Sequence, residues 1–466
     1  HSPRHRGNAL SERVRFEHRS RRRPEGGHME PGEEARKRIS LVVIGHVDAG
    51  KSSCVGQLLL QSGAVSARDA QRAESAARAE NKASFKLAFL TDKSSAERSR
   101  GVTIETSLHK FSTPRFDFNI LDAPGHRDYL KNAITGVAQA DVAMLIVAAG
   151  TGEFEAGLSR QGSTREHMLL AFTLGVKQII VAVNKMDAAS WSEERFDEIR
   201  DTVRLELKKV GYKPAKVTFV PISAFNGHNV GQRYEADDAA WYSGPTLLEA
   251  LDAVREPKRP TDKPLRIPVA DVYNIRGVGA VIAGRVETGV ISARQAVVAA
   301  PGGASGQVRS IEVHHEDRPF AAVGESIGFN VSGVSKADVR RGDVVGPAGE
   351  DRPVAAESFV AQIVVVNHPG AIRAGYQPTV DIHTAHVACR FQELLQLVDR
   401  RTGEVKEESP EALRQGDAAL VRLVPIRPVV VEAFADYAPL GRFVVRDGSA
   451  TVAVGVVREV ARRAAA

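Results

Sequence analysis

A glycine-rich stretch, GHVDAGKSS from Gly45 to Ser53, directly follows the apolar run ISLVVI. Its G-x-x-x-x-G-K-S spacing is typical of a loop whose backbone N–H groups cradle phosphates. Gly45 and Gly50 let the backbone approach, Lys51 reaches the outer phosphates, and Ser52 offers a hydroxyl to Mg²⁺. The following helix would add its positive N-terminal end. This loop alone leaves open a kinase, an ATP-driven motor, a small switch or a GTPase that carries a cargo.

Two further segments are predicted to supply metal and γ-phosphate ligands. DAPGH, Asp122 to His126, follows the apolar run FDFNIL. An aspartate at the end of a neighbouring strand can hold Mg²⁺ through water, and the Gly125 N–H can reach the γ-phosphate. In RGVTIE, Thr103 is expected to complete the metal shell only when the γ-phosphate is present, which makes an order–disorder switch. The predicted metal ligands are therefore Ser52, Thr103 and Asp122.

Base selection is assigned to NKMD, Asn184 to Asp187, which ends the run QIIVAV. The Asp187 carboxylate can accept two hydrogen bonds from the N1–H and exocyclic amine of guanine, a donor pair that adenine lacks. Lys185 can lie along the base plane, and the backbone of SAF, Ser223 to Phe225, can contact the guanine oxygen. Each motif stands at the carboxyl end of a strand, where open α/β sheets bind ligands.

The four segments predict a site for GTP or GDP with Mg²⁺. The residues expected to contact the nucleotide are Gly45, His46, Val47, Asp48, Ala49, Gly50, Lys51, Ser52, Ser53, Asp122, Ala123, Pro124, Gly125, Asn184, Lys185, Met186, Asp187, Ser223, Ala224 and Phe225.

The expected catalytic residue is His126. It follows Gly125, where small switches carry a glutamine, and an imidazole can orient the attacking water. Val47 and Val102 flank the expected γ-phosphate position. We interpret them as an apolar gate that keeps His126 away, with ordinary packing as the alternative.

Alternating strands and helices are expected to position these motifs. Between Ile39 and about Val254, continuous apolar runs alternate with helix-length segments, which indicates a mostly parallel sheet with helices on both faces. In one connecting helix, Ser190 and Glu193 have the spacing of a capping box. Apolar residues then recur every three or four positions until Gly211, which would end the helix.

The pattern changes at REPKRPTDKPLR, residues 255–266, which we interpret as a semi-rigid linker. Short alternating strands with Gly and Pro turns continue to the end and predict two antiparallel β-barrels, divided near Gly349. The fold class is thus an α/β P-loop GTPase domain followed by two β-barrels. The expected division is a disordered basic tail at 1–38, a GTP-binding domain at 39–258, and barrels at 263–350 and 351–466.

Composition narrows the function class. Of 466 residues, 43% are hydrophobic and 26% charged, a globular balance, and no run reaches the roughly 18 apolar residues of a membrane span. Cys54 and Cys389 give no disulfide framework and fit a reducing compartment. The net charge of +6 lies mostly in residues 1–38, with eleven basic and six acidic residues, against 52 and 51 in the remainder. The first methionine is Met29, and we expect natural initiation there.

With these motifs in hand, the chain resembles eukaryotic and archaeal translation elongation factor 1-alpha over about residues 39–462. The similar stretches include DAPGHRDYLKNAITG, TREHMLLAFTLGVKQIIVAVNKMD, GRVETGVI, NHPGAIRAGY and HTAHVACRF, several of them in the barrels. The resemblance implies a ribosome-stimulated GTPase that delivers aminoacyl-tRNA to the ribosomal A site. Its implied partners are aminoacyl-tRNA, the ribosome and a guanine-nucleotide exchange factor. It also implies a cytoplasmic monomer without a membrane partner.

Some positions depart from that family and allow a divergent paralogue. Ala49 replaces the usual loop serine, and SAF stands in place of Ser-Gly-Trp. The alternatives are a related GTPase that delivers a ribosome-rescue or release factor, a non-catalytic scaffold, and a sulfate-activating GTPase. The segment His314 to Glu316 is a weak metal candidate, because adjacent residues point to opposite sides of a strand. Candidate RNA-phosphate contacts, each with ion-paired surface as the alternative, are the segment DVRRG at residues 338–342, Arg373, Arg390 and Arg442.

Overall fold

The computed structural model describes residues 36–66, 68–69, 71–73, 75, 87, 107–124, 134, 136–159, 162–257, 259–313, 316–368, 370–399, 404–448 and 450–463. The expected phosphate-binding loop, residues 45–53, lies wholly within the described residues. The first strand begins at Lys37, two residues before the expected boundary at Ile39.

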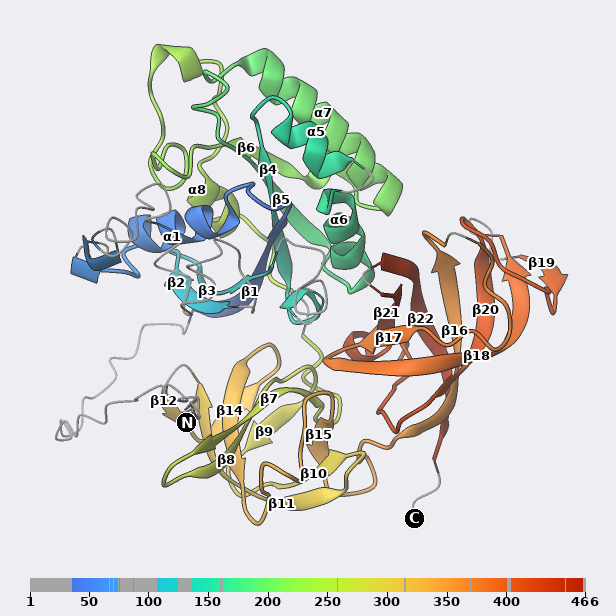
Figure 1. The fold of residues 1–466 in the computed structure, drawn as a ribbon. Coiled ribbons are helices and arrows are strands. Elements are labelled where there is room, and N and C mark those ends of the chain that lie inside the picture. The colour runs from blue at the N-terminus through green and yellow to red at the C-terminus, as the bar shows by residue number, and fades with distance from the viewer. Residues whose placement is uncertain are drawn as a thin grey trace, which may run out of the picture. The chain divides into compact units, whose positions relative to one another are not determined.

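The nucleotide-binding motifs sit on one six-stranded sheet, drawn in blue to green in Figure 1. Its strands lie in the order β2 (Ser107–Ser112), β3 (Phe116–Asp122), β1 (Lys37–Gly45), β4 (Val142–Ala148), β5 (Gln178–Asn184) and β6 (Thr218–Pro221). Only β2 pairs antiparallel, so the carboxyl ends of the other five share one edge. The central strands β1, β4 and β5 are nearly continuous apolar runs because both faces of the sheet are covered.

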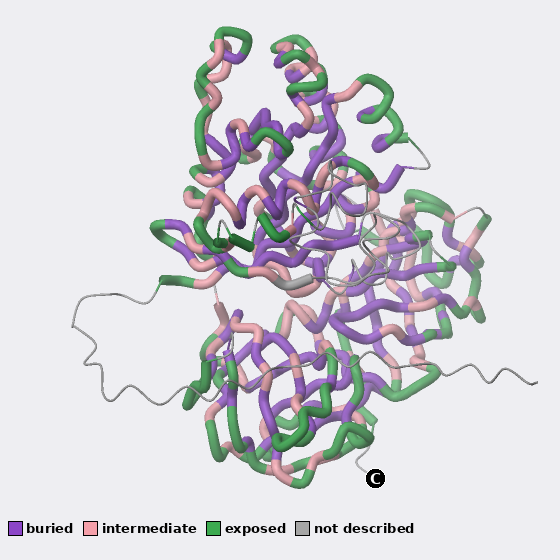
Figure 2. The backbone as a smooth tube through the Cα atoms, turned by 60° about the vertical axis from the view of Figure 1, so that its left-hand side comes forward, coloured by how far each residue is buried: buried purple, intermediate pink, exposed green. Residues whose placement is uncertain are grey.

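Helices cover the two faces of this sheet, and short 3₁₀ turns join some elements. The described helices are α1 (Lys51–Gln61), α5 (Glu153–Leu158), α6 (Thr164–Thr173), α7 (Glu193–Val210) and α8 (Leu247–Asp252). The 3₁₀ turns are η4 (Pro214–Lys216), η5 (Asp237–Ala239) and, between strands of the second barrel, η6 (Ala438–Leu440). Side chains of α5, α6 and α7 pack into one core cluster with the sheet, and those of α1 and α8 into another. Figure 2 shows the burial concentrated along these strands.

The start of α7 differs from the sequence expectation. The helix has the expected apolar face and ends at the expected Gly211, which has φ of 121°. Its N-cap, however, is Ser192, whose hydroxyl accepts the Arg195 N–H, so the Ser190 capping box was wrong. Ser190 and the next residue have φ of 51° and 50°, so the chain turns there and the helix starts later.

Two closed barrels follow the sheet. The strands of the first are β7 (Ile267–Ile275), β8 (Gly279–Arg285), β9 (Val290–Ser292), β10 (Ala296–Ala300), β11 (Ala304–Val313), β12 (Glu316–Arg318), β13 (Phe320–Ala322), β14 (Ser326–Val331) and β15 (Val344–Pro347). Those of the second are β16 (Ala356–Val365), β17 (Thr379–Ile382), β18 (Ala385–Val398), β19 (Val405–Glu408), β20 (Ala418–Pro425), β21 (Arg442–Asp447) and β22 (Ala450–Arg462). Pairing of β10 with β11 and of β17 with β18 closes each ring, while β9 and β13 pair in a separate two-stranded sheet beside the first ring. The expected fold class is confirmed.

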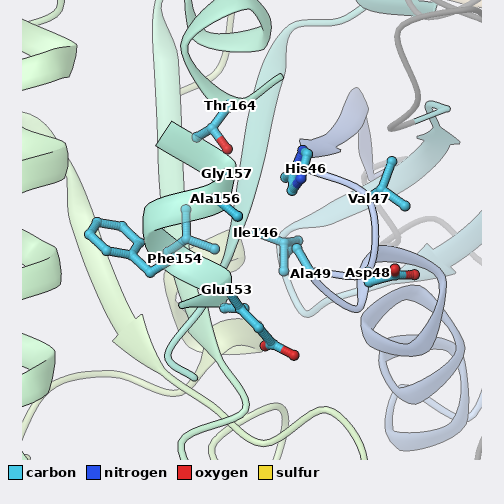
Figure 3. A pocket seen from close by; sticks show the side chains of 12 residues that line it. His46, Val47, Asp48, Ala49, Ile146, Glu153, Phe154, Ala156, Gly157 and Thr164 are labelled. Atoms are coloured by element: carbon cyan, nitrogen blue, oxygen red, sulfur yellow. The ribbon is translucent and has the colours of Figure 1, made fainter. Parts of the chain in front are cut away.

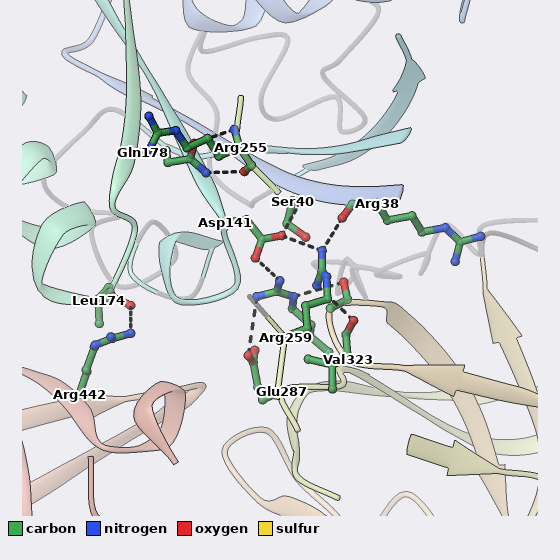
Figure 4. Close-up of polar contacts among 12 residues, drawn as sticks. Arg38, Ser40, Asp141, Leu174, Gln178, Arg255, Arg259, Glu287, Val323 and Arg442 are labelled. Carbon is green, nitrogen blue, oxygen red and sulfur yellow. Dashed lines mark hydrogen bonds and ion pairs between the residues drawn. The ribbon is translucent and has the colours of Figure 1, made fainter. Parts of the chain in front are cut away.

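Charged side chains tie the linker region to its neighbours (Figure 4). Asp141, just before β4, accepts the Ser40 N–H at 2.9 Å and pairs with Arg285 of β8 at 2.7 Å. Arg259 of the linker lies 3.4 Å from the same carboxylate. At the linker's other end, Arg266 is buried and pairs with Glu432 at 3.0 Å. The linker is therefore held at both ends by ion pairs, which its proline content alone does not predict.

Among the helices of the described residues, none combines the length and apolar character needed to span a bilayer.

Candidate guanine-nucleotide site

The phosphate-binding loop joins β1 to α1 at the carboxyl edge of the sheet (Figure 3). Gly50 has φ of 87°, and a Cβ there would lie 2.3 Å from the Asn184 amide nitrogen. A Cβ at Gly45 would lie 2.3 Å from the Ile146 carbonyl oxygen. Both glycines are therefore required for the loop to pack against β4 and β5, in addition to the expected approach to phosphates.

Lys51 is held inside the loop. Its ammonium donates to the His46 carbonyl oxygen at 2.7 Å, and the residue is buried. Burial lowers the pKa of Lys51 from 10.5 to about 8, while the carboxylates of Asp122 and Asp48 act in the opposite direction. An anionic phosphate beside this ammonium would raise the pKa of Lys51 again, because it favours the charged form.

The donors proposed for Mg²⁺ gather beside the loop. Asp122 ends β3 opposite Val43, two residues before Gly45, and is fully buried. Ser52 lies in the first turn of α1, directly after Lys51. A carboxylate and a hydroxyl are hard oxygen donors, which suit Mg²⁺. The chemistry of these two residues fits the ion. Among the described residues, no cluster of three or more His, Cys, Asp or Glu side chains suggests another metal centre.

Asn184 connects three of the predicted motifs. Its amide nitrogen donates to the Ala49 carbonyl oxygen at 2.9 Å, and its amide oxygen accepts the Ala224 N–H at 2.9 Å. Because this side chain is fully engaged with the backbone of the other two segments, its effect on a nucleotide is to position them. Met186, in the same motif, turns into the hydrophobic core.

The base-facing candidates are more exposed. The Asp187 side chain is exposed and makes no ion pair or hydrogen bond with the described part of the chain, so its carboxylate can accept from a ligand. Phe225 is 51% exposed at the end of the SAF segment. Lys185 has φ of 64° and places its ammonium 2.9 Å from Glu153 of α5. The groups predicted to contact guanine thus lie near the end of β5.

Four residues of the prediction lie outside the described residues. They are Val102, Thr103, Gly125 and His126. The gate, the switch threonine and the catalytic histidine therefore stay predictions. The metal candidate at His314 falls in the same category.

Sequence reasoning missed the contacts behind the loop. The Gly45 N–H donates to Nδ1 of His167 on α6 at 3.2 Å. Nδ1 of His46 lies 3.1 Å from the Ser163 hydroxyl. The stretch TREH was recognised only as part of a family resemblance. Nothing in its spacing shows that α6 packs under the loop.

The arginines expected to contact RNA differ in availability. Arg442 is partly buried, its guanidinium lies 4.8 Å from the Phe434 ring centroid, and burial lowers its pKa. Arg373 pairs with Glu411. Arg390 is exposed and makes no side-chain hydrogen bond or ion pair with the described residues, which leaves it the best placed of the three for a phosphate. Arg442 also donates to the Leu174 carbonyl oxygen at 3.4 Å, and its contact with RNA stays a prediction.

Comparison with known proteins identifies the family. The model of the elongation factor Tu GTP binding domain matches residues 36–257, that of elongation factor Tu domain 2 matches 279–346, and the GTP-eEF1A C-terminal domain-like model matches 358–458. Elongation factor 1-alpha of Sordaria macrospora is 52% identical over 441 residues, covering 92% of this chain and 95% of that protein. The chain belongs to the elongation factor 1-alpha family. It is a translational GTPase that binds GTP and GDP.

Other relatives agree with the elongation factor 1-alpha assignment. Elongation factor 1-alpha 1 of Euplotes crassus is 52% identical over 431 residues and covers 92% of this chain and 97% of its own. The solved GTPase-like domain of Saccharomyces cerevisiae Ski7, bound to GTP, matches with a TM-score of 0.74 at 15% identity, over 91% of this chain and 97% of that one. At that identity it supports the fold alone.

Proposed function

We propose that this elongation factor 1-alpha family member, in its GTP form, delivers aminoacyl-tRNA to the ribosomal A site and hydrolyses GTP on codon recognition. The observation that carries this proposal is the 52% identity to elongation factor 1-alpha across the GTPase domain and both barrels. We further propose a cytoplasmic monomer that uses an exchange factor. Its domains would be 39–258, 263–350 and 351–466.

The described residues support a division of labour at the nucleotide. Lys51 would bind the outer phosphates, and Asp187 would accept the guanine N1–H and amine. Ser52 and Asp122 would hold Mg²⁺, which when bound neutralises charge developing on the phosphates. Asn184 keeps the loop and the SAF segment at a fixed separation through its two 2.9 Å hydrogen bonds.

Hydrolysis and switching are assigned to residues outside the described part. His126 would orient the attacking water. Thr103 would order its segment when the γ-phosphate is present. These assignments rest on the sequence motifs and on the family.

The test is protection of aminoacyl-tRNA from spontaneous deacylation by the GTP form and by the GDP form. We expect strong protection with GTP and little with GDP, because a carrier must release its cargo after hydrolysis. Uncharged tRNA serves as a binding control. Equal protection by both nucleotide forms would contradict the carrier function. That result would favour the alternative, delivery of a protein factor, even though the sequence identity to elongation factors points to the carrier.

A further inference from the structure

The geometry points to Glu153 as a positioning residue for the guanine base, which it serves by fixing the side chain of Lys185. The two carboxylate oxygens of Glu153 lie 2.9 and 3.0 Å from the Lys185 ammonium. The inference rests on the proposed role of the NKMD motif in base binding. It adds a residue from a different element, α5, that none of the nucleotide motifs contains.

The backbone end of Lys185 is already immobilised. The preceding Asn184 side chain is bonded to the loop and to the SAF segment. The following Met186 is fully buried and its N–H donates to the Ile222 carbonyl oxygen at 3.1 Å. Lys185 itself takes a left-handed φ of 64°. With the ammonium held by Glu153 as well, both ends of the four-carbon stem are fixed.

The position of that stem matters because Asp187 lies two residues further along. Asp187 is the proposed acceptor of the guanine N1–H and amine, so the base must lie close to this segment. A lysine stem held along one path offers the base a ready apolar surface. A free lysine would lose rotamer entropy when the base binds, and this loss would weaken binding.

Glu153 can serve as an anchor because α5 is firmly attached to the domain. Its next residue, Phe154, is 6% exposed and packs in the core. Figure 3 shows Glu153 and Phe154 leaving the helix in different directions. Arg195 of α7 donates to the Ala149 carbonyl oxygen at 3.0 Å and to the Glu155 carboxylate at 2.9 Å. Glu155 in turn accepts the Gly152 N–H at 2.8 Å, which caps the helix.

Folding stability does not account for the Glu153–Lys185 pair. The two side chains are 48% and 31% exposed, and ion pairs at such sites add little to stability because water screens them. The pair can still strengthen nucleotide binding, because it orders the lysine side chain before the base binds.

The experiment measures release of a fluorescent GDP analogue from the full-length protein by stopped flow, with GDP affinity by calorimetry. The variants are E153Q, K185A, the double variant E153Q/K185A, and D201N as a control. Asp201 forms an exposed ion pair with Arg200 on α7 at 3.1 Å, apart from the Arg195 contacts that hold α5. E153D is added as a conservative variant that keeps the charge, and thermal unfolding checks that each variant folds.

We expect E153Q to speed GDP release about three- to tenfold, a loss of roughly 1 kcal/mol. D201N should match the wild type, and E153D should recover part of the effect. The double variant should equal K185A alone, since Glu153 acts only through the lysine. Additive effects, or an E153Q rate equal to that of D201N, would overturn the inference. Unchanged GDP binding in K185A would instead contradict the proposed base site.

Discussion

Among single residues, Asp187 is the one on which base selection is expected to depend. Its carboxylate is exposed at the end of β5, beside the SAF segment. We predict that Asp187→Asn shifts preference from guanine to xanthine nucleotides, because the amide donates where xanthine offers a carbonyl. The lost charged hydrogen bonds should cost about 2–4 kcal/mol for GTP. Affinities for GTP and XTP decide it, with Asp197→Asn on α7 as a control, and unchanged affinities for both would refute the assignment.

His126 is expected to carry the chemistry. We predict that His126→Ala leaves GTP affinity within a few-fold but removes most ribosome-stimulated hydrolysis, because the effector supplies most of the acceleration in such GTPases. Single-turnover hydrolysis with programmed ribosomes measures this. A normal stimulated rate would show that another group orients the water.

Lys51 gives the nucleotide site a pH dependence. In the free protein its pKa is lowered to about 8 by burial, and phosphates beside it would raise that value. Above pH 8 the free lysine is therefore largely neutral, so GDP binding must take up a proton and affinity should fall as the pH rises. Calorimetry at pH 9 in buffers of different ionisation enthalpy should detect this uptake. It should shrink at pH 7, where the free lysine is already charged, and equal uptake at both values would contradict the prediction.

At the scale of elements, the two serines before α7 allow a matched comparison. Ser192 accepts the Arg195 N–H at 3.2 Å, whereas Ser190 stands in a turn with φ of 51°. Ser192→Ala should cost about 1 kcal/mol of local helix stability and Ser190→Ala close to nothing. Native-state hydrogen exchange of the first α7 amides reports local opening directly. Equal protection in the two variants would mean that the cap contributes nothing measurable.

The same helix shows what a sequence can and cannot predict. The spacing of Phe196, Ile199 and Val203 correctly gave the buried face, because periodicity depends only on neighbours along the chain. The Ser190 cap failed because its motif ignores the backbone angles of the turn. Contacts such as Glu153 with Lys185 join segments 32 residues apart, so no local pattern contains them.

At the scale of the whole molecule, the near-zero net charge after residue 38 limits how tRNA can be bound. After residue 38 the chain holds 52 basic and 51 acidic residues, so a broad positive field is absent. Exposed arginines such as Arg390 must then act as local contacts. Buried charges near the linker, such as those of Asp141 and Arg266, pair with Arg285 and Glu432 within the protein, so they are not free to contact an external partner.

The binding of aminoacyl-tRNA should therefore survive loss of the basic tail. The deletion is best made at residues 1–35, because Lys37 begins β1 and pairs with Glu256 at 2.6 Å. We predict that affinity persists in this variant and falls with salt with a slope of about −0.7 to −0.9 per phosphate contacted.

Thr103→Ala should weaken binding even with GTP present, because the γ-phosphate could no longer order the switch. Filter binding with charged and uncharged tRNA, in GTP and in GDP, measures all of these effects. Binding that vanishes with the tail, or that is equal in all four conditions, would reject the carrier function, because a nonspecific basic segment would then account for the affinity.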